Sequence, residues 1–204
     1  MNKKLIPCIS IIILLLGLLS TTCHASAEAK VFSNGLSPVY NNCAVYAADG
    51  LRKLGYSPCT AAIGSITKSE MLQYISRTDN NYGLYYHGLG GQGYFIDYYR
   101  NNISASDLSG YWDLVFIDSS ESARDYTLSN ALHTTNIANR VFVGWHDVVS
   151  YGNAETFNYY FWLEQVGHGA SIVSCAVSAA AHVSGSNSAP IRVFGSSTYT
   201  GVAR

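Results

Sequence analysis

The segments WDLVFID, residues 112–118, and NRVFVGWH, residues 139–146, are apolar along nearly their whole length. A strand with one face in water alternates apolar and polar residues, whereas a strand covered on both faces is continuously apolar. Helical patterns separate these segments from other strand-like stretches, and strands joined through helices form a mainly parallel sheet. The sequence therefore predicts a three-layer α/β domain with a mainly parallel sheet flanked by helices.

The remaining elements follow from capping signals and periodicity. Ser37 and Pro38 mark a helix start and Gly55 its end, while Thr67 and Glu70 have the spacing of a capping box. These patterns predict helices at residues 37–55, 67–75, 121–132, 155–166 and 170–183, and further strands at 82–88, 93–99 and 190–194.

The N-terminal residues 1–27 have the layout of a secretory signal peptide. Lys3 and Lys4 precede an apolar run, and Ala25-Ser26-Ala27 forms a cleavage motif. The run is short for a membrane anchor, which is one alternative, and lipid attachment at Cys23 is another. We expect a secreted or periplasmic protein without a stable membrane anchor, with one domain at residues 28–204.

Charge and cysteines add three expectations. The chain has 12 basic and 13 acidic residues, so nothing in its charge favours nucleic acid as a partner. Export to an oxidising compartment would favour a disulfide between Cys43 and Cys59. Cys175 falls in an apolar helical run, which indicates a buried, unreactive thiol.

Two polar residues lie at predicted strand ends. His87 closes the aromatic strand YGLYYHG, and Ser120 follows LVFID. In mainly parallel sheets the carboxyl ends of the strands share one edge, where ligands bind. The sequence therefore predicts that His87 and Ser120 share a functional site.

This order of motifs resembles the caspase-like cysteine peptidases, which include metacaspases and gingipains. YYHG, residues 85–88, is similar to their histidine motif. VFIDSSES, residues 115–122, is similar to the metacaspase sequence Asp-Ser-Cys-His-Ser-Gly, with Ser120 at the cysteine position. The resemblance covers roughly residues 82–183 and includes secreted bacterial proteins of this group.

The resemblance implies cleavage of a peptide or protein substrate after a basic residue. His87 would be the acid–base residue, Ser120 the nucleophile, and the backbone N–H groups of Gly88 and Ser120 the oxyanion donors. Asp118 would line the pocket for arginine or lysine. No metal or other cofactor is implied. His146 and Asp147, at the end of another predicted strand, are further candidates for substrate binding.

Serine at the nucleophile position predicts reduced or lost activity. A thiol has a pKa of about 8.5 and an unactivated hydroxyl one far higher, so alkoxide formation costs on the order of 10 kcal/mol more. A serine enzyme therefore needs a base in direct contact, itself held by a third group.

Other interpretations stay open at this point. Ser119 or Ser120 could cap the predicted helix 121–132, and Asp118 could cap it or pair with Arg124. His87 could be a structural histidine. A non-catalytic secreted binding or surface protein, using its many tyrosines for contact, is the alternative function.

Overall fold

A six-stranded sheet organises the computed structural model, which describes residues 27–76, 82–183 and 190–202. The strand order is β2-β1-β3-β7-β8-β9, and every neighbouring pair is parallel except β8 and β9. The strands are β1 (Glu28–Ser33), β2 (Cys59–Ile63), β3 (Tyr82–His87), β7 (Leu114–Asp118), β8 (Val141–Trp145) and β9 (Ile191–Gly195). The predicted mainly parallel sheet is confirmed.

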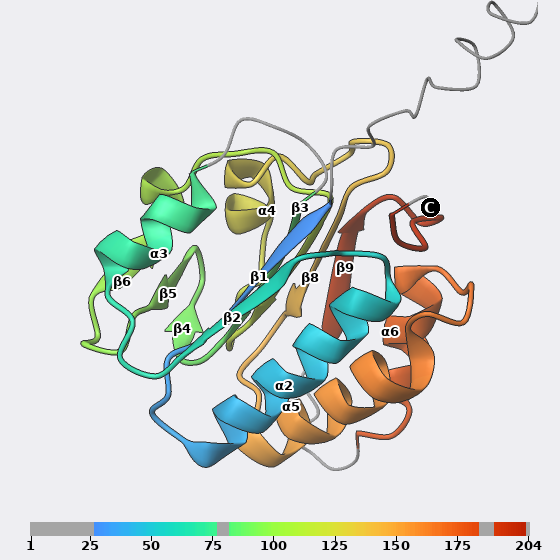
Figure 1. Ribbon diagram of the computed structural model, residues 1–204, viewed down its shortest axis with the longest axis horizontal. Helices are drawn as coiled ribbons and strands as arrows, with labels where there is room; N and C mark the ends of the chain where they lie inside the picture. Colours follow the sequence, from blue (N-terminus) through green and yellow to red (C-terminus); the bar gives the residue numbers. More distant parts are fainter. Residues whose placement is uncertain (1–26, 77–81, 184–189, 203–204) are drawn as a thin grey trace, which may run out of the picture.

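Helices cover both faces of this sheet (Figure 1). One face packs against α2 (Pro38–Lys53), α5 (Tyr151–Asn158), the π-helical η2 (Tyr159–Gln165) and α6 (Ile172–Ala180). The other face carries α3 (Lys68–Ile75), the 3-10 helix η1 (Ala105–Asp107), α4 (Thr127–Ala131) and a small sheet of β4 (Gly90–Gly91), β5 (Tyr94–Ile96) and β6 (Asn102–Ser104). Each face therefore has its own hydrophobic core, and the three predicted layers are confirmed.

The two helix starts marked by capping signals, at Ser37 and Thr67, are also confirmed. Pro38 occupies the first turn of α2 after Ser37, where a missing N–H costs nothing. In α3 the Thr67 side chain accepts from the Glu70 N–H, and the Glu70 carboxylate accepts from the Thr67 N–H at 2.8 Å. This reciprocal pair satisfies two N–H groups that the first helical turn leaves unpaired.

Strand parity and register decide which side chains meet at the carboxyl edge. In β7, Phe116 packs into the core beneath α2 and α5, whereas Ile117 packs into the opposite core. Successive side chains alternate between faces, so Asp118 follows Phe116 to the α2 side. His87 pairs in register with Asp118, and Tyr85 lies two residues earlier on the same face.

The segment after β7 differs from the prediction of a helix over residues 121–132. Residues 119–125 form turns, and α4 begins only at Thr127. The Ala123 N–H donates to the Trp145 carbonyl at 2.8 Å and the Glu121 N–H to the Asp147 carbonyl at 3.2 Å. These bonds attach the segment to β8 and the loop after it, so its N–H groups are not available to a helix.

Several further elements were not predicted or have different extents. β1 and β2 were not expected, and the strand expected over residues 93–99 is only β5, in the small sheet. The C-terminal segment returns to the turn after α2, where the Tyr56 and Tyr199 hydroxyls lie 2.5 Å apart. Apart from Ala27, the predicted signal peptide lies outside the described residues. Within the described ranges, every helix is too short or too polar to cross a bilayer.

Candidate active site

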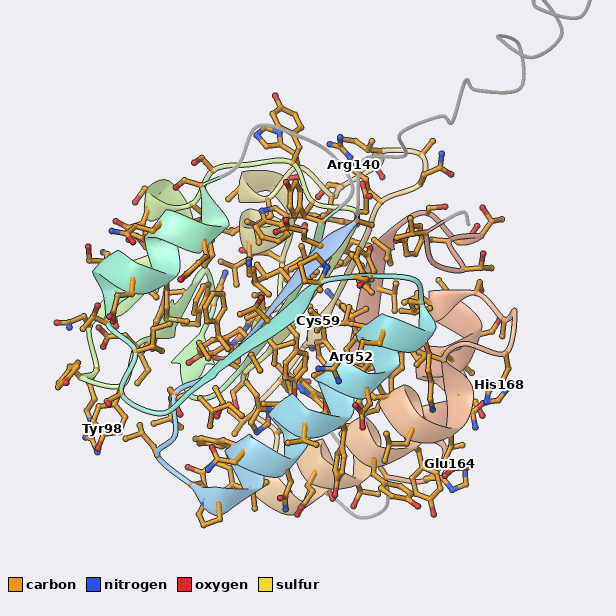
Figure 2. The ribbon with its side chains drawn as sticks, viewed as in Figure 1. Arg52, Cys59, Tyr98, Arg140, Glu164 and His168 are labelled. Carbon is orange, nitrogen blue, oxygen red and sulfur yellow. The ribbon has the colours of Figure 1, made fainter. Side chains whose placement is uncertain are left out.

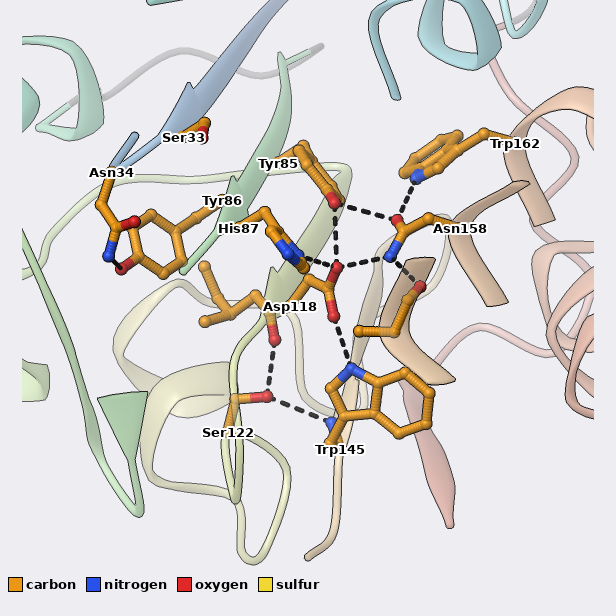
Figure 3. A network of polar contacts seen from close by, with 12 residues as sticks. Ser33, Asn34, Tyr85, Tyr86, His87, Asp118, Ser122, Trp145, Asn158 and Trp162 are labelled. Carbon is orange, nitrogen blue, oxygen red and sulfur yellow. Dashed lines mark hydrogen bonds and ion pairs between the residues drawn. The ribbon is translucent and has the colours of Figure 1, made fainter. Parts of the chain in front are cut away.

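A histidine and an aspartate form a buried pair at the ends of two adjacent strands, β3 and β7. His87 Nδ1 is hydrogen-bonded to Asp118 Oδ2, and the two residues are 2% and 1% exposed (Figure 3). A carboxylate can only accept, so Nδ1 carries the proton and donates. This fixes the neutral imidazole in the tautomer whose Nε2 is a hydrogen-bond acceptor.

Three further side chains hold Asp118. Its Oδ2 lies 2.9 Å from the Tyr85 hydroxyl and accepts from Asn158 Nδ2 at 2.5 Å. Its Oδ1 accepts from Trp145 Nε1 at 2.5 Å. Burial and the Asp118 charge raise the pKa of Tyr85 well above its ordinary value, so its hydroxyl stays a donor. Both carboxylate oxygens are thus fully engaged, which fixes the position of the carboxylate beneath the His87 ring.

Asn158 ties this network to the helical layer. Its Oδ1 accepts from Trp162 Nε1 at 3.0 Å, and its Nδ2 also donates to the Ala154 carbonyl at 2.7 Å (Figure 3). Asn158 is the last residue of α5, and the π-helical η2 begins at the next residue. π-Helical turns are often found at functional sites, where they re-aim side chains.

His87 also lines a small cavity. His87, Gly88, Asp118, Ser119 and Ser120 all line this cavity of about 30 Å³. His87 Nε2 and Ser119 Oγ are buried and make no hydrogen bond with any described residue. A structural histidine is normally satisfied at both nitrogens, so an unpaired Nε2 favours a functional role.

Ser120 lies on a strained turn directly after β7. Its Oγ accepts a hydrogen bond from the Val149 N–H at 3.2 Å, which leaves its own proton free to be donated. The next residue, Glu121, has a φ of 58°, a left-handed conformation that non-glycine residues seldom adopt. Such strain persists where surrounding contacts enforce it, and it is concentrated at functional sites.

Ser122 supplies one of those contacts. Its hydroxyl donates to the Ile117 carbonyl at 2.6 Å and accepts from the Trp145 N–H at 3.1 Å (Figure 3). The turn is therefore fixed to both β7 and β8. The helix-cap interpretation of Ser119 and Ser120 is wrong, because α4 begins after Tyr126, beyond this turn. Arg124 pairs with Glu121 and not with Asp118.

Two tyrosines cover the cavity. Tyr40, from α2, contacts the His87 ring edge-on with centroids 4.7 Å apart, and Tyr151 packs on Tyr40 at 5.4 Å. Tyr40 is 1% exposed, whereas Tyr151 is 52% exposed. A cavity of this size has room for about one water molecule. Both rings line the cavity together with Ser120, which is itself half-buried.

The Gly88 and Asp118 assignments need correction. The Gly88 N–H donates to the Asp118 carbonyl at 3.3 Å, continuing the ladder between β3 and β7, so it is not directed at a substrate. Asp118 does not line an open pocket for arginine or lysine, because its carboxylate is buried and bound by four side chains.

His146 and Asp147 lie beside the site and not in it. Their side chains pair with each other at 2.9 Å, and neither residue lines the cavity. The Asp147 carbonyl accepts the Glu121 N–H, so this pair borders the turn that carries Ser120. A longer substrate could meet the Asp147 carboxylate, which is 52% exposed.

The predicted Cys43–Cys59 disulfide is not formed, since both residues are free thiols. Cys59 is the first residue of β2 and pairs in register with Ala29, at the amino end of the strands (Figure 2). The Cys43 thiol lies at the carboxyl end instead, within 4.8 Å of His87 and Asp118 donor atoms. The length of the strands therefore separates the two sulfurs. Cys175 is buried, as predicted.

Cys43, His87 and Asp118 have a spacing that could suit a metal ion. The geometry fits hydrogen bonding better. His87 Nδ1 and Asp118 are already bonded to each other, and burial raises the pKa of the Cys43 thiol far above its ordinary value. A metal requires the thiolate, which this environment opposes.

Sequence reasoning missed the residues that hold Asp118, namely Tyr85, Trp145 and Asn158. Two of them had a readable signal. Tyr85 precedes His87 by two residues and so shares its face, and Asn158 is a lone amide within the aromatic run FNYYFW. No comparable sequence signal indicates that Cys43 lies close to Asp118.

No protein-family model matches the chain, and comparison with curated proteins found no match.

Proposed function

We propose that this protein is a caspase-like peptide-bond hydrolase in which Ser120 is the nucleophile. The single observation that carries the proposal is the Asp118–His87 pair, whose remaining nitrogen, Nε2, belongs to a residue lining the same cavity as Ser120. Support also comes from the sequence motifs around both residues, which lie at the ends of adjacent strands.

The Asp118–His87 pair addresses the difficulty of a serine nucleophile. Because an alkoxide is on the order of 10 kcal/mol harder to form than a thiolate, the base must remove the proton during attack. Serine hydrolases meet this requirement with an imidazole that is hydrogen-bonded to the serine and oriented by a carboxylate. Here Asp118 orients His87, but Nε2 has no partner among the described residues, so the Ser120 hydroxyl must turn toward Nε2 for the attack. We therefore propose an active serine enzyme, although substitution of cysteine by itself predicts reduced activity.

In the proposed reaction Ser120 Oγ attacks the substrate carbonyl carbon while its proton passes to His87 Nε2. The imidazolium that forms is stabilised by Asp118, whose charge is held by Tyr85, Asn158 and Trp145. His87 then donates its proton to the leaving amine, and water hydrolyses the acyl-enzyme by the reverse transfer.

The preference for basic residues is the least supported part of the proposal. Asp118, its expected source, is occupied by its own hydrogen bonds. Asp147 and Glu121, near the turn that carries Ser120, are acidic alternatives, but Glu121 is paired with Arg124 and Asp147 with the His146 ring. Substrate tests should therefore include peptides that end in a neutral residue as well as peptides that end in arginine or lysine.

The rival function, a non-catalytic binding protein, has less support. The exposed tyrosines belong to several separate elements and loops; they include Tyr74, Tyr98, Tyr111, Tyr126 and Tyr159. Others are buried in the two cores and serve packing.

The test combines covalent labelling with hydrolysis. The purified protein is treated with a fluorophosphonate probe, and the adduct is mapped by peptide mass spectrometry. Fluorogenic peptides ending in arginine, lysine or a neutral residue are assayed in parallel. The variants are Ser120→Ala, Ser120→Cys and His87→Gln, with Ser69→Ala, an exposed serine on α3, as the matched control.

We expect an adduct on Ser120, and hydrolysis that is lost in Ser120→Ala and His87→Gln and kept in Ser69→Ala. Hydrolysis by Ser120→Cys alone would overturn the serine mechanism and indicate a surviving site with a disabled nucleophile. Failure of every form to react or hydrolyse would favour the binding protein.

A further inference from the structure

Ser119 carries a buried hydroxyl that its surroundings do not satisfy. The residue is 1% exposed, and its Oγ makes no hydrogen bond with any described residue. A buried polar group without a partner carries an uncompensated desolvation penalty, so it calls for an explanation. Ser119 lines the same cavity as His87 and Ser120, so the residue is adjacent to the proposed nucleophile and base.

Its neighbour Ser122 shows the contrast. The Ser122 hydroxyl both donates and accepts, to the Ile117 carbonyl and from the Trp145 N–H, and so has an evident structural role. Ser119 has no such role within the described part of the chain. Its Oγ lies close to Gly90, where an added Cβ would come within 2.6 Å of it.

The proposed reaction has lost one of its two expected oxyanion donors, and the Ser119 hydroxyl could take its place beside the Ser120 N–H. Acyl transfer places negative charge on the carbonyl oxygen, and fixed donors aimed at that oxygen lower the barrier. The Gly88 N–H, expected in this role, is bonded to the Asp118 carbonyl at 3.3 Å. Side-chain hydroxyls can supply the same hydrogen bond.

We infer that the Ser119 hydroxyl is an oxyanion donor, an inference that rests on the function proposed above. When Ser120 Oγ bonds to the carbonyl carbon, its proton moves to His87 Nε2 and the π electrons move to the carbonyl oxygen. The Ser119 O–H then donates to this oxyanion. When the oxyanion re-forms the carbonyl, the C–N bond breaks and the amine takes the proton from His87.

Ser119→Ala tests this role with three measurements on the intact protein: kcat and KM on the best fluorogenic peptide, the affinity of the matching peptide aldehyde, and the melting temperature. Ser69→Ala is again the matched control, and Ser120→Ala marks the background rate. The aldehyde forms a tetrahedral adduct on Ser120 and so reports on the oxyanion.

We expect kcat to fall on the order of 10²–10³-fold in Ser119→Ala, as for loss of one oxyanion donor, with little change in KM. The aldehyde should lose affinity by a similar factor. The melting temperature should not fall, because the variant removes a hydroxyl that has no partner. A merely structural role would give the reverse: lower stability with kcat unchanged.

Two other outcomes would overturn the inference. A wild-type kcat in Ser119→Ala would show that the hydroxyl is not a donor while leaving the Ser120 mechanism in place. A fluorophosphonate adduct mapped to Ser119 would make that residue the nucleophile instead. Absence of any adduct and any hydrolysis in the wild type would overturn the proposed function and this inference together.

Discussion

Replacing Asp118 by asparagine should leave one hydrogen-bond donor of the site without an acceptor and so destabilise the fold. The carboxylate accepts on both oxygens, from His87, Tyr85 and Asn158 on Oδ2 and from Trp145 on Oδ1. An amide has one accepting oxygen and one donating NH₂ group. The orientation that keeps most bonds places the oxygen at the Oδ2 position. The NH₂ group then faces the Trp145 N–H, with two donors opposed and no acceptor between them.

This arrangement sets the expected loss of folding stability in Asp118→Asn. The three remaining bonds lose their charge assistance, but a charge no longer has to be buried, and these effects oppose each other. What remains is the unsatisfied Trp145 N–H, which costs about 1–3 kcal/mol. For a domain of this size each 1 kcal/mol lowers the melting temperature by roughly 2–4 °C. Asp118→Asn should therefore melt about 2–12 °C below the wild type.

A double-mutant cycle with Trp145→Phe isolates the cause. In the wild type, Trp145→Phe removes a hydrogen bond to a charged group, worth about 1.5–3 kcal/mol. In Asp118→Asn it removes the opposing donor, so it should cost much less. We expect urea unfolding to give a double variant at least ~0.5 kcal/mol more stable than the sum of the single effects. Trp112→Phe, whose ring lies in the opposite core, is the control and should be additive with Asp118→Asn. Additivity of the Trp145 pair would refute the reasoning.

Further predictions concern access, packing and pH. Tyr151→Ala removes the half-exposed ring over the cavity, so fluorophosphonate labelling should become faster; an unchanged rate would argue against a tyrosine cover. Gly50→Ala places a Cβ 2.4 Å from the Trp162 ring, and this overpacking should cost about 1–3 kcal/mol by urea unfolding despite the gain in helix propensity; a more stable variant would contradict it. The hydrogen bond from Lys68 is the main cause that lowers the pKa of Asp107 from 3.8 to about 2, and hydrogen bonds from Ser104 add to it. The carboxylate is therefore favoured in the folded state. The stability difference between wild type and Asp107→Asn, at most ~1 kcal/mol, should be present above pH 4 and disappear as the pH falls toward 2; melting temperatures measured across this range would show a persistent difference if the assignment is wrong.

Local patterns were sufficient to predict much of the fold. β3, β7 and β8 are mostly apolar and buried on both faces, so the sequence pattern was clear. The start of α2 is marked by Pro38 and the start of α3 by the Thr67 cap. β1 and β2 were missed for a physical reason. β2 is a sheet edge with mostly exposed or half-exposed residues, so its pairing with β1 depends on register and not on a strong apolar pattern.

The sequence predicted only those site residues that lie at the ends of neighbouring strands. His87 and Ser120 share a cavity because β3 and β7 are adjacent and parallel, and their ends coincide. The role of Asp118 depends on which face its side chain occupies and on what covers that face. Asn158 and Cys43 lie close to Asp118 but belong to helices that are distant in sequence. The Gly88 N–H is bonded to the Asp118 carbonyl, and this bond depends on the strand register, which the sequence does not show.

The Tyr56–Tyr199 contact bears on how the chain folds. It joins residues 143 positions apart, and the Val202 N–H adds a bond to the Leu54 carbonyl at 2.9 Å in the same place. Contacts of such sequence separation require loop closure before they contribute, and proteins rich in them fold slowly. The turn that follows α2 should therefore acquire its final packing among the last regions of the molecule, and hydrogen exchange during refolding should find its amides protected late.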